Sequence, residues 1–126
     1  LHQTLLDTFE KFKHSSTDII AEIAWTYLQF ALDNRAIFKL MFSGALEEER
    51  DHPEYVETSL KNIALLEEII AFCQNKGQLE EGKVETIAIR LWSSVHGFAH
   101  LALEDQFPKE YVQDQSLKEL LKIAIS

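Results

Sequence analysis

The sequence predicts an all-α fold, a helical bundle of about six helices in one domain that spans residues 1–126. Three observations support this prediction. Apolar residues recur at three- and four-residue spacing along almost the whole chain. Few runs alternate with a period of two, so no sheet is expected. The chain has only four Gly and two Pro, too few for a turn-rich all-β protein.

The helices expected in the first half are separated by polar breaks. Residues 1–12 carry a first apolar stripe, which residues 14–18 interrupt with side chains that favour caps and turns. A second stripe occupies residues 19–31. A short third one, over residues 37–42, is expected to end at Ser43-Gly44, because Gly is favoured just after a helix C-terminus. The charged run that follows, from Glu47 to His52, predicts a solvated loop.

Three further helices are expected in the second half. Pro53 suits a helix start, because its missing N–H costs nothing there. The next helix is expected to begin near Lys83 and to end at Phe107-Pro108. The last helix starts with Ser116 and Glu119 at the spacing of a capping box.

Composition excludes several classes of protein. With 12 basic and 21 acidic side chains the formal charge is −9, which disfavours this chain as the part that grips nucleic-acid phosphates. A single Cys excludes an internal disulfide framework and a Cys-rich zinc site. The chain starts at Leu1, without the features of a signal peptide, and no apolar run is long enough to span a membrane. We therefore expect a cytoplasmic fragment or domain of a longer protein, with no membrane contact.

The helix expected from Lys83 has two apolar or small-residue faces. A helix that covers a core on one side should be charged on the other. Here the second face carries small and apolar residues, which suit close packing against another helix. A symmetric partner chain would complete such a bundle, so a homodimer is expected. Coverage of both faces within one monomer is the alternative. At 100° per residue, one face gathers Leu91, Trp92, Val95, Phe98, Ala99 and Ala102, and the other Ile89, Ser93, Gly97, His100 and Leu101.

Catalytic and cofactor motifs are not apparent in the sequence. His96, His100 and Glu104 stand four residues apart on one helix, a spacing that can hold a metal, but interior and interface roles for the histidines are the simpler interpretation. We predict no catalytic residue, no metal and no cofactor. The many aromatic side chains fit either an ordinary core or an apolar small-molecule pocket.

Two motifs resemble those of a known family. The run LWSSVHGFA at residues 91–99 resembles the Trp-x-x-x-His-Gly signature of one group of TetR-type (tetracycline-repressor-like) transcriptional regulators. The run WTYLQFALDNRAIFKLMF at residues 25–42 is similar to a helix pair of the same group. The resemblance covers nearly the whole chain, with Arg35 standing where the family often has Pro. It implies that the chain is the C-terminal effector-binding and dimerisation domain, and that DNA is contacted only through an N-terminal helix-turn-helix domain absent from this chain.

The resemblance also implies site residues. A small apolar or aromatic effector would change the tilt of residues 1–12 and thereby the DNA affinity of a repressor. Helical modules that bind a partner helix, and metal-binding bundles, are the alternatives. The implied ligand-binding residues are Trp25, Gln29, Phe38, Met41, Phe42, Leu66, Ile69, Trp92 and His96. The implied dimer-interface residues are Ser93, Gly97, His100, Leu101, Leu117, Leu120, Leu121 and Ala124.

Overall fold

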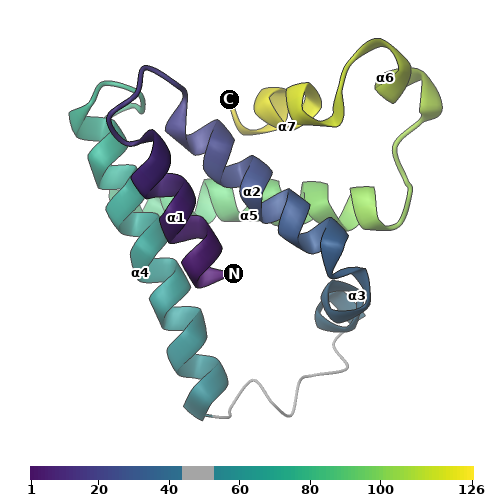
Figure 1. The fold of residues 1–126 in the computed structure, drawn as a ribbon, viewed down its shortest axis with the longest axis horizontal. Helices are drawn as coiled ribbons and strands as arrows, with labels where there is room; N and C mark the ends of the chain where they lie inside the picture. The colour runs from purple at the N-terminus through teal and green to yellow at the C-terminus, as the bar shows by residue number, and fades with distance from the viewer. Residues whose placement is uncertain (44–52) are drawn as a thin grey trace.

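The computed structural model describes residues 1–43 and 53–126, and the side chains of residues 40–43, 53–59 and 114 lie outside the description. Within this part of the chain seven helices and no strand occur, so the predicted all-α fold is confirmed (Figure 1). No described helix is both long and apolar enough to cross a lipid bilayer. The helices are α1 (His2–Phe12), α2 (Ile19–Asp33), α3 (Arg35–Ser43), α4 (Pro53–Asn75), α5 (Val84–Leu103), α6 (Lys109–Asp114) and α7 (Leu117–Ile125).

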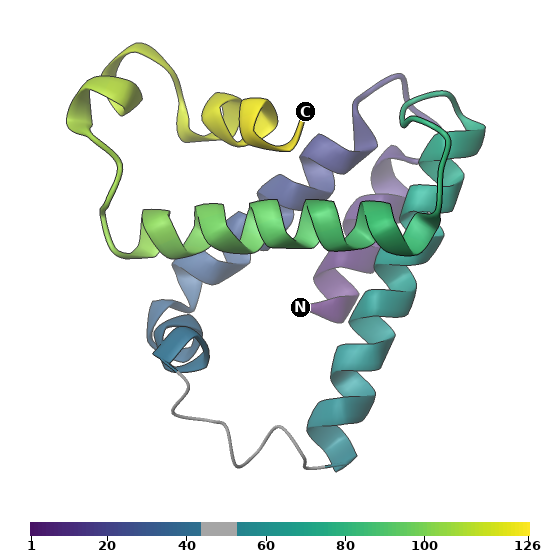
Figure 2. The ribbon, with the colours of Figure 1, turned by 180° about the vertical axis from the view of Figure 1, so that it is seen from behind.

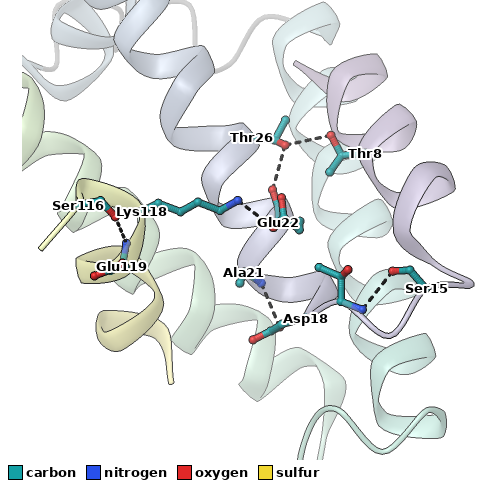
Figure 3. Close-up of polar contacts among 10 residues, drawn as sticks. Thr8, Ser15, Asp18, Ala21, Glu22, Thr26, Ser116, Lys118 and Glu119 are labelled. Carbon is teal, nitrogen blue, oxygen red and sulfur yellow. Dashed lines mark hydrogen bonds and ion pairs between the residues drawn. The ribbon is translucent and has the colours of Figure 1, made fainter.

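Two helices begin at the polar residues that the sequence pattern indicates. Asp18 caps α2, and its carboxylate accepts a hydrogen bond from the backbone N–H of Ala21 at 3.2 Å. Ser116 caps α7, and its hydroxyl accepts from the N–H of Glu119 at 3.2 Å (Figure 3). Such caps satisfy first-turn N–H groups that have no partner inside the helix. The break expected at Gly44 and the loop expected over residues 47–52 fall outside the described residues.

The prediction is wrong at the C-terminal end of α5. This helix was expected to reach Pro108, but it ends at Leu103, and the unpredicted short helix α6 follows. Asp105 adopts a left-handed conformation with φ of 51°, and the next N–H, that of Gln106, donates to the carbonyl of Leu101 at 2.9 Å. This is the hydrogen bond of a Schellman motif, which normally has Gly at the left-handed position. An Asp there gives no such signal in the sequence.

The core forms around α2 and α5, which pack against each other (Figure 2). α4 and α7 each contact both of these helices, while α1 contacts α2 and α4. Burial of these apolar faces is the main stabilising contribution, as in helical bundles generally. The largest fully buried side chains come from α2, α4, α5 and α7 and are Ile19, Leu28, Ile69, Ile70, Cys73, Leu103 and Leu121.

Two connections between helices are held together by polar contacts. Gln78, just after α4, accepts from the N–H of Ile19 at 3.0 Å and donates to the carbonyl of Thr17 at 3.0 Å. Lys76 donates through Nζ to the carbonyls of Lys13 and Ser15. The α1–α2 connection is therefore fastened to the α4–α5 connection, which holds α1 beside α4.

Leu28 offers a test of the packing. We expect Leu28→Ala to lower the free energy of unfolding by about 3 kcal/mol, because it removes a side chain with no exposed surface and leaves a cavity. Urea denaturation followed by circular dichroism measures this change. In the matched control Leu60→Ala, where the side chain is 60% exposed, the loss should stay below about 1 kcal/mol. Equal losses in the two variants would contradict the described core.

Candidate functional site

A cavity of about 290 Å³ lies among α1, α2, α4 and α5. This volume is close to the lower end of the range for small-molecule sites, roughly 300–1,000 Å³. Its walls are mostly aliphatic, because the four helices turn their apolar stripes toward one another here. The lining residues among those described are Leu1, Leu5, Ile20, Ile23, Ala24, Tyr27, Asn62, Ile63, Leu65, Leu66, Ile69, Leu91, Trp92, Val95 and His96.

A hydrogen bond between Tyr27 and His96 joins α2 to α5 at the cavity wall. The hydroxyl oxygen of Tyr27 lies 3.0 Å from Nδ1 of His96. Burial raises the pKa of Tyr27 to about 12, so its hydroxyl stays protonated at neutral pH. Burial also lowers the pKa of His96, and the neighbouring His100 lowers it further, which favours the neutral imidazole. The ring of Phe38 meets the Tyr27 ring edge-on, with centroids 5.8 Å apart.

Asn62 contributes a different kind of polar group. It is one of the lining residues that α4 contributes. Its Oδ1 is buried and has no hydrogen-bond partner within the described part of the chain. Unpartnered buried polar atoms are rare in folded proteins and call for a specific explanation.

The structure brings together four of the predicted ligand-binding residues, namely Leu66, Ile69, Trp92 and His96. Three others lie elsewhere. Phe38 is buried beside Tyr27, outside the described lining, and Gln29 is exposed on α2. Trp25 faces α7, where Nζ of Lys118 lies 5.9 Å from its ring centroid. The side chains of the remaining two, Met41 and Phe42, lie outside the described residues.

Sequence reasoning missed the two polar residues Tyr27 and Asn62. A signal for Asn62 existed, because it precedes Leu66 by four residues and Ile69 by seven, which places all three on one helix face. Tyr27 likewise continues the spacing of the cavity-lining residues earlier in α2. In both helices the apolar spacing indicates the face that lines the cavity, but it does not single out the polar residue on that face.

A second surface is formed by α5, α7 and the segment between them. A shallow groove here is lined by four predicted interface residues, Gly97, Leu101, Leu120 and Ala124. Ser93 and His100 are exposed on α5. Leu117 is partly buried against the core, and Leu121 lies within it. The groove is also lined by Ser94, Phe98, Phe107, Tyr111 and Ile123.

Two features of this surface suit close contact with another helix. An added Cβ at Gly97 would meet no atom within 4 Å, so the position is open. Large apolar side chains remain exposed nearby, with Leu101 at 42% and Ile123 at 60%. Adjacent exposed apolar side chains are typical of interaction surfaces.

Metal and thiol chemistry find no support among the described residues. No group of three or more His, Cys, Asp or Glu there is close enough to hold a metal ion, so His96, His100 and Glu104 do not form one. Cys73 is buried, and its pKa is raised to about 11, mainly by burial and further by Asp18, although Lys76 opposes the shift. A protonated buried thiol is a poor nucleophile.

The lowered pKa of His96 gives a pH prediction. Its contribution to stability should be complete above about pH 6.5, the ordinary pKa of unfolded His, and should be lost as the pH falls toward the lower folded value. Between pH 7.5 and 5.5 we therefore expect the Tm of the wild type to fall more than that of His96→Gln. Differential scanning calorimetry measures both. The exposed His14→Gln control should keep the wild-type fall, and equal falls in wild type and His96→Gln would refute the assignment.

Comparison with known proteins identifies the family of this chain. Residues 20–124 match the family model described as the tetracyclin repressor-like C-terminal domain. No curated protein and no solved structure matches the chain significantly. The finer assignment to the Trp-x-x-x-His-Gly group stays a prediction. The family match covers α2 through most of α7 and agrees with the all-α architecture, so the chain belongs to the tetracycline-repressor-like C-terminal domain family of transcriptional regulators.

Proposed function

We propose that this domain binds a small, mainly apolar effector in the cavity among α1, α2, α4 and α5, and that effector binding changes the DNA affinity of a dimeric repressor. The observation that carries the proposal is the composition of the cavity wall, which is mostly aliphatic and includes Leu1 and Leu5 at the start of α1. In this proposal the DNA-reading helix-turn-helix belongs to a domain outside this chain, and the regulator works in the cytoplasm without catalysis.

The packing of α1 supports a route from effector to DNA. Leu1 and Leu5 line the cavity, so a ligand there would contact α1 directly. The hydroxyls of Thr8 and Thr26 lie 2.9 Å apart and connect α1 to α2 (Figure 3). A ligand that fits one position of α1 better than another shifts the population of the two positions.

A modest tilt of α1 would be enough to affect DNA binding. Dimeric helix-turn-helix proteins need their recognition helices about 34–36 Å apart, one turn of DNA. Because such a domain would be joined to the N-terminal end of α1, a tilt of α1 in each protomer changes that separation. Release of the operator on effector binding is the expected consequence for a repressor.

The groove between α5 and α7 is the proposed dimer contact. Its open Gly97 and exposed Leu101 and Ile123 would be covered by the same elements of a second copy, giving a four-helix arrangement. A partner helix from a different protein is the second candidate for this groove, because the apolar exposure alone fits both occupants.

Gly97→Arg tests the dimer. The open space at Gly97 lets the folded monomer accept the side chain, but a buried, unpaired charge at a symmetric contact should raise the dimer dissociation constant at least about tenfold. Sedimentation equilibrium at micromolar concentration measures the shift toward monomer. Asn75→Arg, at an exposed position at the end of α4, should leave the assembly state unchanged. A wild-type protein that sediments as a monomer would refute the proposal of a dimer.

Leu66→Trp tests the cavity. We expect propylbenzene to bind the wild type, and the larger side chain to weaken that binding at least about tenfold, because it occupies the space of the ligand. Isothermal titration calorimetry measures both affinities. Leu60→Trp, in the same helix but exposed, should bind as the wild type does. Unchanged binding by Leu66→Trp would place the ligand elsewhere.

A further inference from the structure

The two ends of α1 differ in what they contact. At the N-terminal end, Leu1 and Leu5 line the cavity and remain partly exposed. Toward the C-terminal end, Phe9 is only 4% exposed, and its ring meets the ring of Phe72 in α4 edge-on, with centroids 5.2 Å apart. One end of the helix therefore borders the cavity, while the other is packed against a neighbouring helix.

Polar contacts strengthen the attachment just after the C-terminal end of α1. Lys76, which follows α4, donates through Nζ to the carbonyls of Lys13 and Ser15. Gln78 bonds two further backbone groups within residues 17–19. A cation near the carbonyl end of a helix is also favoured by the helix dipole. Two side chains from the α4–α5 connection thus hold four backbone groups at this end.

The polar contact between the middle of α1 and α2 can be released at little cost. The hydroxyl oxygens of Thr8 and Thr26 lie 2.9 Å apart, and each also lies 2.9 Å from a carbonyl four residues earlier in its own helix, that of Thr4 or of Glu22 (Figure 3). Each hydroxyl has one proton, so at most two of these three contacts are hydrogen bonds at one time. If α1 moves away from α2 here, both hydroxyls keep a bond within their own helix.

We propose that α1 pivots about its C-terminal end, where Lys76 is the positioning residue that holds the carbonyl of Lys13, and that a ligand in the cavity displaces the N-terminal end. This inference rests on the proposed effector-binding function and adds the point about which α1 turns. A helix rises about 1.5 Å per residue, so positions 3, 7 and 11 lie roughly 15, 9 and 3 Å from residue 13. A pivot there displaces the three positions in a ratio of roughly 5:3:1.

Nitroxide spin labels at these three positions of α1 test the pivot. All three positions are exposed and lie four residues apart on one face, so a pivot moves them in the same direction. Each chain also carries a reference label at Lys122→Cys, an exposed position of α7, and is diluted in excess unlabelled chain. Double electron–electron resonance measures the distance between the two labels before and after saturation with propylbenzene. We expect a shift at position 3 roughly fivefold that at position 11, with position 7 between them. The α1 labels are placed by Gln3→Cys, Asp7→Cys and Lys11→Cys, and the wild type treated with the same reagent controls for labelling of buried Cys73.

Variants of Lys76 then assign the pivot to one side chain. In Lys76→Met the carbonyl of Lys13 is no longer held, so the ratio of the shifts at positions 3 and 11 should fall from roughly fivefold to about twofold or less. Lys76→Arg can donate the same hydrogen bonds and should keep the wild-type ratio. The matched control Lys83→Met, at an exposed lysine just before α5, should keep it as well.

The outcomes separate this inference from the proposed function. If isothermal titration calorimetry detects no binding of propylbenzene to the wild type, the effector-binding function and this inference are overturned together. If propylbenzene binds but the three shifts are equal, absent or confined to position 3, as fraying of the helix end would give, the cavity binds ligands but α1 does not pivot. An unchanged ratio in Lys76→Met would overturn the role of Lys76. The wild-type comparison decides the pivot even if Lys76→Met does not fold.

Discussion

α2 and α5 pack against each other at the centre of the bundle, and α1, α3, α4 and α7 each contact at least one of these two helices. The cavity lies against this contact and is bounded further by α1 and α4. α7 packs against both α2 and α5 (Figures 1 and 2). The same helix α5 therefore contributes to the cavity wall and to the exposed groove. A shift of α5 relative to α2 would therefore change the shape of both the cavity and the groove.

The cavity wall contains few polar side chains, and they differ in whether they have a hydrogen-bond partner. The bond between the Tyr27 hydroxyl and Nδ1 of His96 joins α2 to α5. Oδ1 of Asn62 is buried without a hydrogen-bond partner within the described part of the chain, and the wall to which Asn62 belongs is mostly aliphatic. A buried polar group with a partner stabilises the native arrangement, whereas one without a partner is destabilising.

Much of the fold could be predicted because its signals are local. Apolar spacing and caps such as Asp18 and Ser116 depend on neighbours within a few residues, and the structure contains both caps. The two Schellman motifs show the limit. Gly77, with φ of 82°, supplies the left-handed residue after α4, whereas Asp105 does so after α5 without a Gly to indicate it.

By itself, the sequence determined six of the seven described helices, the two-faced character of the residues that form α5, and the family resemblance, because these depend on spacing along one chain. Only the tertiary structure decided which apolar side chains line the cavity and which pack in the core. Trp25 and Leu66 both lie on apolar stripes, yet one faces α7 and the other the cavity. Helical spacing gives each residue a direction relative to its own helix, but the crossing of four helices sets what lies in that direction.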